Sequence, residues 1–388
     1  MKIPFTRPYR TGNEQKYIND ILTNIQNGAP ISGDGPYGKK CEQLMEEKFG
    51  ARKVLLTTSC TSALEMATRL INIQPGDEVI MPSFTFVSTA NPVVMAGGRP
   101  VFVDIDPVTL NIDPAKIEEA ITPRTKAIYP VHYAGVSCPM DEIMAIAKKY
   151  NVWVVEDAAQ GVGAKYKGKY LGTIGDFGCY SFHETKNITC GEGGALVINR
   201  DDPDLIERAE IIREKGTDRS KFHRGQVDKY TWVDVGSSYV QSEILAAFLF
   251  AQLEAMDEIN QKRMEIWYKY YTQLKPFEES GVIRLPVIPD YAEHNAHIFY
   301  VLFQEQSVRD TVMKQLQEAG IHAVFHYIPL HSSPMGQTFG CQDGDLPVTE
   351  ETSGRLLRLP LFTGMSNDEE NFILSRLKQV VEELRRNN

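Results

Sequence analysis

The sequence has few cysteines, and their spacing fits neither a disulfide framework nor a zinc site. Six cysteines occur in 388 residues, and no two of them stand in a C-x-x-C pair. Such a set is typical of reduced thiols in a cytoplasmic protein. The chain also lacks an apolar run long enough to span a membrane, and the residues after Met1 do not form the apolar core of a signal peptide. We therefore expect a soluble cytoplasmic protein without a membrane partner.

An excess of positive charge is also lacking. The 41 lysines and arginines are outnumbered by 51 aspartates and glutamates, which gives a formal net charge of −10. An acidic chain without a basic tract is a poor match for nucleic acid, so we expect no such partner. A small anionic substrate is compatible with this charge, because it needs only a local basic pocket. The composition, 42% hydrophobic and 24% charged, leaves room for one large globular domain and a smaller one.

Two apolar runs in the middle of the chain lead to the residues on which a functional prediction depends. The run at 152–155 ends in Glu156 and Asp157, and the apolar and aromatic run at 177–182 precedes Lys186. Both runs are predicted as buried strands. A carboxylate would then stand at the end of one strand and an amine shortly after the other.

A carboxylate and a lysine at neighbouring strand ends are what pyridoxal 5′-phosphate (PLP) chemistry requires. The lysine amine bonds the cofactor aldehyde, and the carboxylate keeps the pyridine nitrogen protonated so that the ring can take up electrons. Lys186 must lose its proton for this task, against an ordinary lysine pKa of about 10.4. Burial beside another positive centre would lower that pKa. The alternative is a surface lysine and an unrelated strand-end aspartate, and from the residues alone both interpretations stand.

Three ordered blocks of sequence resemble the DegT/DnrJ/EryC1/StrS family of nucleotide-sugar aminotransferases. They are Glu156–Gln160 (EDAAQ), Ser181–Asn187 (SFHETKN) and Gly191–Gly194 (GEGG). The second block is similar to the branch that makes dTDP-4-amino-4,6-dideoxygalactose for enterobacterial common antigen, and the similarity runs from the start of the chain to its end. The resemblance implies an α/β protein with fold type I of PLP-dependent aminotransferases. In that fold a large domain has a mostly parallel seven-stranded sheet between helices, and a small C-terminal domain is α+β.

The resemblance also implies a cofactor site, with Lys186 and Asp157 as the catalytic residues. An aromatic ring at Phe86 would stack on the pyridine face, Gln160 would lie beside the phenolic oxygen, and hydroxyls at a helix start would cradle the phosphate. The plainer interpretations are a core aromatic ring, a solvated loop amide and an ordinary helix cap. The expected cofactor-binding residues are Ser59, Cys60, Thr61, Phe86, Asp157, Gln160, Ser181, Lys186 and Ser238.

One of these positions departs from the broad family. That family often has asparagine where Ser238 stands and arginine where Val240 stands. The departure leaves open whether a neighbouring subunit supplies the usual amide to the phosphate, although a serine hydroxyl can still donate one hydrogen bond.

Substrate contacts are expected, by the same resemblance, from Tyr133, His183, Lys215, Tyr327 and His331. Lys215 begins a loop at 215–226 that is rich in lysine and arginine. This loop is either solvated or a mobile segment that meets the substrate diphosphate across a dimer interface. The two histidines of the segment 325–331 could indicate a metal. No carboxylate or cysteine cluster accompanies them, so we expect no metal site.

Strand and helix patterns alternate along the first half of the chain. Such alternation predicts a largely parallel sheet that is covered on both faces and gathers ligands at the carboxyl ends of its strands. Besides the two strands above, the predicted strands are 54–56, 78–81, 100–103 and 127–131, and the predicted helices are 13–26, 39–49, 85–95, 114–121, 140–150 and 203–214. The segment Gly33–Gly38 matches G-x-G-x-x-G, but no strand precedes it and Pro36 interrupts it. We therefore interpret it as a loop and not as a dinucleotide site.

Three regions are expected along the chain. They are a large PLP-binding domain over 1–240, a linking helix and linker over 241–285, and a small domain over 286–388. The linking helix is predicted as one helix from 240 to about 275. In the small domain, predicted strands at 297–302, 323–324 and 359–361 alternate with predicted helices at 307–318, 348–357 and 367–386.

The reaction implied by the resemblance is transfer of an amino group from L-glutamate to a dTDP-linked 4-keto-6-deoxy sugar. From dTDP-4-keto-6-deoxy-D-glucose it would give dTDP-4-amino-4,6-dideoxy-D-galactose and 2-oxoglutarate, in a homodimer with shared active sites. The gluco epimer and attack at C3 of a related keto-sugar stay open. A PLP-dependent sugar dehydratase is disfavoured, because that branch replaces the lysine by histidine. A non-catalytic sugar-nucleotide binding or sensor protein is disfavoured by the complete pair of Asp157 and Lys186.

Overall fold

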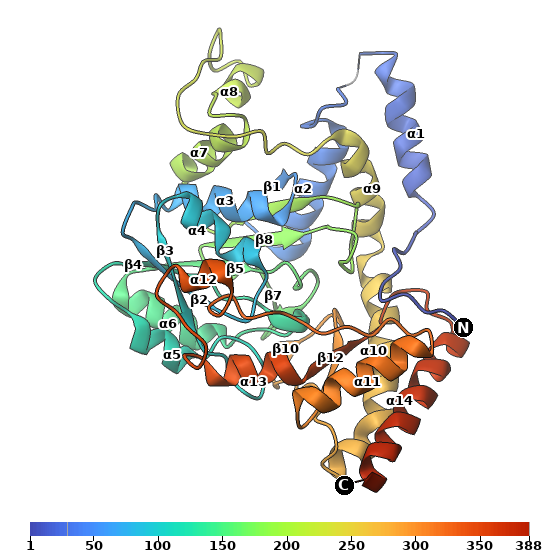
Figure 1. Ribbon diagram of the computed structural model, residues 1–388. Coiled ribbons are helices and arrows are strands. Elements are labelled where there is room, and N and C mark those ends of the chain that lie inside the picture. Colours follow the sequence, from blue (N-terminus) through green and yellow to red (C-terminus); the bar gives the residue numbers. More distant parts are fainter. Residues whose placement is uncertain (29, 388) are drawn as a thin grey trace.

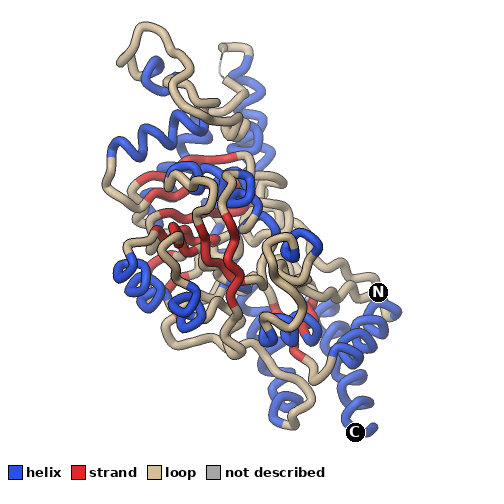
Figure 2. The backbone as a smooth tube through the Cα atoms, turned by 60° about the vertical axis from the view of Figure 1, so that its left-hand side comes forward, coloured by secondary structure: helices blue, strands red, loops and turns tan. Residues whose placement is uncertain are grey.

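A sheet of seven strands lies at the centre of the structure, a computed structural model that describes residues 1–28 and 30–387. Helices cover the sheet in Figures 1 and 2, and the strand order is β1-β9-β8-β5-β4-β2-β3. The strands are β1 Lys53–Thr57, β2 Glu78–Pro82, β3 Arg99–Val103, β4 Thr125–Ile128, β5 Trp153–Asp157, β8 Phe177–Ser181 and β9 Gly194–Ile198. This architecture confirms the predicted α/β class and fold type I.

The sheet is parallel except at one strand. β8, β5, β4, β2 and β3 pair in parallel, whereas β9 pairs antiparallel with both β8 and β1. The sequence prediction of a mostly parallel sheet is therefore right, but it located no strand at Gly194–Ile198. The glycines at 191, 193 and 194 are typical of a loop, and this pattern concealed the strand that begins at Gly194.

The two faces of the sheet bury alternate residues of each strand, as the period of a strand requires. Val54 and Leu56 pack with one buried cluster and Leu55 with the other. The first cluster is shared with α1 Glu14–Ile25, α2 Pro36–Phe49, α5 Pro114–Ala120, α6 Met140–Tyr150 and α9 Glu243–Glu254. The second is shared with α3 Cys60–Leu70, α4 Asn91–Met95 and α7 Pro203–Arg213.

A separate buried cluster forms in the C-terminal part of the chain. It is built from α10 Met256–Glu279, β11 Phe299–Leu302, α11 Gln306–Glu318, β12 Leu356–Leu359 and α14 Asn367–Asn387. Ile3, near the start of the chain, packs into the same cluster, and its backbone N–H donates to Gly320 O at 2.8 Å. The first residues thus lie against the C-terminal part, although the proposed domain boundaries placed them with the large domain. The remaining short elements are η1 Val87–Thr89, η2 Tyr133–Gly135, β6 Lys165–Tyr166, β7 Lys169–Tyr170, α8 Arg219–His223, β10 Ala292–Glu293, α12 Pro334–Gln337 and α13 Pro347–Arg355.

Several predicted elements have different limits in the structure. The predicted helix from 240 to 275 is two helices, α9 and α10, which meet at Ala255. The predicted helix at 85–95 is η1 followed by α4, because Pro92 stands in the first turn of a new helix. The predicted strand at 323–324 is a single bridge between Val324 and Arg358. Among the described residues, no helix is both long enough and apolar enough to cross a membrane.

Candidate active site

The carboxyl end of β5 presents two neighbouring acids to opposite faces of the sheet. Asp157 has the same parity as Val155, which packs with the α3 side, so its side chain faces α3 and η1. Its Oδ2 accepts a hydrogen bond from Thr89 Oγ1 at 2.8 Å, and its Oδ1 accepts one from the Ala159 N–H at 3.1 Å. Burial raises the pKa of Asp157, and the two hydrogen bonds and the charge of Lys186 offset part of that rise.

Glu156 faces the other way and has a structural task. It is fully buried, and its carboxylate accepts the backbone N–H groups of Gly172, Ile174 and Gly175 at 2.6–2.8 Å. His132 completes the set, with Nε2 at 2.9 Å. Because the Cys138 backbone N–H donates to His132 Nδ1, Nδ1 carries the lone pair and Nε2 carries the proton that is donated to Glu156. The acid beside Asp157 is therefore fully engaged within the protein.

Lys186 stands in the loop between β8 and β9 and is half-buried. Burial lowers its pKa, Cys60 and Asp157 partly offset that effect, and the positive charge of Arg358 adds to it. Each member of the Asp157–Lys186 pair thus acts on the pKa of the other. The two side chains therefore lie within reach of each other's charge, and their joint catalytic role stays a prediction.

The lysine loop is fixed by its neighbour, Asn187, which the sequence analysis did not single out. Asn187 Nδ2 donates to Asn295 O at 2.8 Å and to Asn260 Oδ1 at 3.0 Å. Its Oδ1 lies 3.0 Å from His297 Nδ1. Since Asn260 belongs to α10 and His297 precedes β11, one amide ties the lysine loop to the C-terminal part. In the sequence, only the position of Asn187 in the SFHETKN block, next to Lys186, could have suggested this role.

The N-terminus of α3 lies beside the lysine loop. Ser59 caps this helix by accepting the Ser62 N–H at 3.0 Å, and Thr61 Oγ1 donates to Ser88 Oγ at 2.8 Å. Cys60 is buried in the first turn. Gly194 of β9 allows the close approach, since a Cβ there would lie 2.3–2.5 Å from atoms of Ser59 and Cys60. Free backbone N–H groups and hydroxyls gathered at a helix start suit a phosphate.

The other predicted cofactor contacts surround the same place. Phe86 is 58% exposed, unlike a core aromatic ring, and caps the turn that carries Thr89. Gln160 is buried: its Oε1 accepts the Ala134 N–H at 2.7 Å and its Nε2 donates to Tyr327 Oη at 3.0 Å. Ser181 is buried at the end of β8.

Tyr133 and Tyr327, two of the predicted substrate contacts, belong to an aromatic cluster next to Gln160. Tyr133 Oη lies 3.0 Å from His326 Nδ1, and the rings of His326 and Tyr327 stack with centroids 3.5 Å apart. Phe84 packs edge-on against Tyr327. Residues from the segments that follow β2 and β4 and from the C-terminal part thus converge on one wall of the site.

His331 differs from the expectation of a substrate contact. Its side chain is fully buried, with Nδ1 at 2.7 Å from Ser83 Oγ and Nε2 at 2.9 Å from Glu350 Oε1. Both ring nitrogens are engaged within the protein, so His331 holds its loop against the end of β2 and presents nothing to a substrate.

Three further predicted residues are more exposed. His183 is half-buried and lies 3.6 Å from the Glu192 carboxylate. Lys215 and Ser238 are exposed on the segment that follows α7, and this segment carries α8 away from the sheet in Figure 1. Within a single chain, neither Lys215 nor Ser238 is enclosed by the other site residues.

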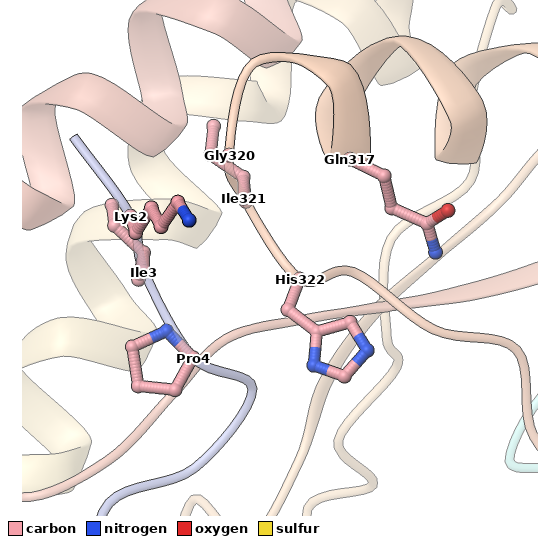
Figure 3. Close-up of a pocket in the computed structure, with 7 residues that line it drawn as sticks. All are labelled: Lys2, Ile3, Pro4, Gln317, Gly320, Ile321 and His322. Atoms are coloured by element: carbon pink, nitrogen blue, oxygen red, sulfur yellow. The ribbon is translucent and has the colours of Figure 1, made fainter.

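These residues fit PLP. A buried carboxylate without a cation hydrogen-bonded to it matches a protonated pyridine nitrogen, a lysine of lowered pKa matches the aldehyde, and the start of α3 matches the phosphate. Figure 3 shows a surface pocket at Ile3, Gln317 and His322, which contains none of the predicted site residues. In the described part of the chain, no group of three or more His, Cys, Asp or Glu side chains could hold a metal ion.

Comparisons with known proteins agree with this geometry. The model of the DegT/DnrJ/EryC1/StrS aminotransferase family matches residues 12–378. The spore coat polysaccharide biosynthesis protein SpsC of Bacillus subtilis is 34% identical over 387 residues, which covers 98% of this chain and 97% of that protein. A pleiotropic regulatory protein of Geobacillus stearothermophilus is 35% identical over 347 residues, 89% of each chain.

Solved structures are similar over the whole length. A putative sugar aminotransferase of Streptococcus pneumoniae superposes with a TM-score of 0.90 at 27% identity, and the match covers 99% of this chain and 98% of that one. The same protein has also been solved in a PLP form and a PMP form.

Proposed function

This chain belongs to the DegT/DnrJ/EryC1/StrS aminotransferase family and depends on PLP, and from this premise we propose its substrates. The amino donor is L-glutamate and the acceptor is dTDP-4-keto-6-deoxy-D-glucose, which give 2-oxoglutarate and dTDP-4-amino-4,6-dideoxy-D-galactose. The observation that carries the proposal is the buried Asp157 at the end of β5, together with Lys186 of lowered pKa within reach of its charge, in a sugar aminotransferase fold. The SFHETKN block around Lys186 supports the choice of sugar.

Each residue of the pair has one task in the proposed reaction. Bound PLP supplies an aldehyde that accepts amines and a protonated ring that takes up electrons. Asp157, held by Thr89 and Ala159, keeps the proton on the ring nitrogen. Lys186 Nζ, whose lowered pKa favours the neutral amine, would accept the proton of the donor α-carbon and return it to the bound cofactor. The same nitrogen moves the proton back when the sugar is the substrate.

The remaining proposed contacts position the cofactor and the sugar. The hydroxyls of Ser59, Thr61 and Ser181, with the first turn of α3 at Cys60, would hold the phosphate. Phe86 would cover one face of the ring and Gln160 would donate to its phenolic oxygen. Tyr133, Tyr327 and His183 would line the place of the sugar.

A homodimer with shared active sites is part of the proposal. The segment 215–238 carries Lys215 and Ser238 together with an exposed apolar set. That set is Phe222, Tyr230, Trp232, Val233 and Val235. An exposed apolar patch on a projecting segment is typical of a surface that a partner covers. A second copy would bring Lys215 and Ser238 to the phosphate groups of a neighbouring site.

Two alternatives are tested by the same experiment. The enzyme could form the gluco epimer or act at C3 of a related keto-sugar, since these outcomes depend on which face of the cofactor the sugar meets. A non-catalytic sugar-nucleotide sensor is the alternative of another class, and the name of the Geobacillus relative, a regulatory protein, favours it.

The experiment supplies the PLP-loaded protein with dTDP-4-keto-6-deoxy-D-glucose and L-glutamate and assigns the product by NMR. An axial amine at C4 is expected. An equatorial amine at C4 would instead identify the gluco epimer as the product, and an amine at C3 would identify the enzyme as a C3 aminotransferase. Absence of any amine, together with an absorbance of bound PLP that glutamate leaves unchanged, would favour the sensor.

A further inference from the structure

Ser83, His331 and Glu350 form a buried bridge between the sheet and the C-terminal part of the chain. Ser83 follows β2, and its Oγ lies 2.7 Å from His331 Nδ1 and accepts the His331 backbone N–H at 3.0 Å. His331 Nε2 lies 2.9 Å from Oε1 of Glu350, which belongs to α13. The backbone N–H of Leu330 also donates to Ser83 O, at 3.1 Å. The segment that contains His331 is thus hydrogen-bonded directly to the end of β2.

The bridge is closed to a substrate. A Ser–His–Glu arrangement can activate a serine as a nucleophile where that serine is open to a substrate, but the side chains of Ser83 and His331 are fully buried. Burial alone would raise the pKa of Glu350, whereas hydrogen bonds from His331 and from the backbone N–H groups of Gly344 and Leu346 lower it. Its carboxylate is therefore an ionised, fixed acceptor. The bridge can hold segments in place but cannot attack a substrate.

Both ends of the bridge adjoin the aromatic wall of the candidate site. Phe84 directly follows Ser83, and its ring packs edge-on against that of Tyr327 with centroids 5.6 Å apart. Tyr327 and His326, whose rings stack, stand shortly before His331 in the same segment. The bridge therefore joins the part of the wall that follows β2 to the part that the C-terminal segment supplies.

The wall is aromatic and carries no charge near neutral pH. Burial raises the pKa of Tyr133 and of Tyr327 and lowers that of His326, so all three rings are neutral. Their polar tips can still exchange hydrogen bonds, as Tyr327 Oη does with Gln160 Nε2 at 3.0 Å. Neutral rings with polar tips suit a sugar, which has apolar C–H faces and hydroxyls. They suit glutamate less well, because they offer no counter-charge to its two carboxylates.

We propose that His331 is a positioning residue for the acceptor sugar. The inference rests on the proposed transamination of a keto-sugar and adds the residue that holds the sugar-binding wall in place. By tying Ser83 to Glu350, His331 keeps Tyr327 against the rings on the sheet side. Lys186 stands on another loop, between β8 and β9. Loss of the bridge should therefore loosen the place of the sugar and leave the reaction with glutamate intact.

The first test compares the two half-reactions in His331→Phe, which keeps a ring but loses both side-chain hydrogen bonds. The pyridoxamine-phosphate-loaded proteins are mixed with dTDP-4-keto-6-deoxy-D-glucose. We expect the concentration that gives half the limiting rate to rise about tenfold or more in the variant. Glutamate should react with the PLP-loaded variant as it does with the wild type, and the amplitude of that reaction measures the folded fraction. Equal saturation of both proteins by the keto-sugar, or an equal loss toward glutamate, would overturn the proposal.

The second test measures binding without reaction and uses Ser83→Ala, a smaller change that removes only the serine hydroxyl of the bridge. dTDP-glucose, which has a sugar but no keto group, and dTDP, which has no sugar, are titrated by calorimetry into the pyridoxamine-phosphate-loaded proteins. We expect the variant to bind dTDP-glucose about two- to tenfold more weakly, as for loss of one hydrogen bond, and to bind dTDP as the wild type does. Unchanged binding of dTDP-glucose, or equal weakening of both ligands, would contradict the positioning role.

The matched control is Thr349→Val. Thr349 directly precedes Glu350 in α13 and is fully buried, and its Oγ1 donates to Asp104 Oδ1 at 2.7 Å. The change removes another buried hydrogen bond between the C-terminal part and the end of a sheet strand, but neither partner belongs to the wall. We expect a lower melting temperature and unchanged saturation by the keto-sugar.

The outcomes for the two proposals are distinct. The same loss toward the keto-sugar in Thr349→Val as in His331→Phe would show that any loosening of this region has the effect, and would overturn the specific role of His331. The proposed function fails separately, if the wild type reacts with glutamate but aminates no keto-sugar.

Discussion

The buried carboxylate of Asp157 suits a bound cofactor but lowers the stability of the cofactor-free protein. Burial raises its pKa, and the Thr89 hydroxyl and one backbone N–H are its hydrogen-bond donors. Thr85 lies 2.8 Å from Thr89, and because Thr89 gives its proton to the carboxylate, Thr85 must donate to Thr89. Neither threonine could be identified from the sequence, since Thr85 and Thr89 are ordinary residues of a predicted helix.

The first prediction concerns Asp157→Asn. A carboxyl whose pKa is raised in the folded state adds stability below its unfolded pKa, and this stability is lost as the pH rises through the folded pKa. At neutral pH the ionised Asp157 therefore destabilises the cofactor-free protein. We expect the asparagine variant to melt a few degrees higher without cofactor, with the difference shrinking in acid, and to bind PLP more weakly. Calorimetric melts of both cofactor-free proteins from pH 4 to 8 test it, and a lower melting temperature of the variant at neutral pH would contradict it.

The second prediction concerns Lys186→Ala and Lys186→Arg. Both variants should lose transamination by at least 10²–10⁴-fold, because the first removes the proton carrier and the second holds a permanent charge in its place. Release of 2-oxoglutarate measures activity, and circular dichroism should show an unchanged fold. The control is Lys169→Ala on the exposed β7. Transamination at the native rate by the alanine variant would remove Lys186 from the mechanism.

At the scale of elements, the segment Gly33–Gly38 shows why a matching motif is not a binding site. The carboxylate of Glu243, the first residue of α9, accepts the backbone N–H groups of Gly35, Tyr37 and Gly38 at 2.9–3.0 Å. These groups form the start of α2, where a dinucleotide phosphate would bind in a nucleotide fold. The anion-binding position at this helix is thus filled by the protein itself, which agrees with the rejection of a dinucleotide site. The prediction of a loop over the whole segment is wrong, because residues 36–38 form the first turn of α2.

The third prediction follows from that contact. Glu243→Ala leaves three buried N–H groups without an acceptor, and we expect a loss of about 2–4 kcal/mol in the free energy of unfolding. Glu243→Gln keeps an oxygen acceptor and should lose less. Urea unfolding measures both, with the exposed Glu47→Gln on α2 as a control that should change stability by less than about 0.5 kcal/mol. A Glu243→Ala protein as stable as the control would refute the capping role.

The elements were predicted best where a strand or helix is long and regularly patterned. β2, β5 and β8 lie close to their predicted limits because continuous apolar runs mark buried parallel strands. β9 escaped prediction because its apolar run at 195–198 directly follows Gly191, Gly193 and Gly194, a pattern typical of a loop. The break between α9 and α10 carries no proline or glycine signal. Only the packing shows it, because α10 starts on the core of the sheet with α9 and continues on the C-terminal core.

At the scale of the whole molecule, packing within a single chain does not explain why the apolar side chains of the segment 215–238 are exposed. Trp232 is 77% exposed, and this segment projects beyond α7 in Figure 1. An aromatic side chain so placed is typical of a residue that dominates an interface. The proposed homodimer accounts for it, together with the exposure of Lys215 and Ser238.

The fourth prediction concerns Trp232→Ser. Sedimentation velocity of the wild type should give twice the mass of the 43.7 kDa chain, and the variant should dissociate at concentrations at least tenfold higher. Transamination should fall with the loss of the dimer, because the proposed site is shared. Tyr150→Ser on α6, at another face of the molecule, should remain dimeric. A monomeric wild type would contradict the proposed assembly.

The sequence by itself determined the chemistry: a lysine and an aspartate after two buried strands, in blocks that match an aminotransferase family. Such information is local, because a strand and the residue at its end are neighbours in the chain. Only the tertiary structure decided that Glu156 is structural and Asp157 is not, and that His331 is enclosed. Those facts depend on contacts between residues up to 248 positions apart in the chain, and packing, not the order of residues, sets such contacts.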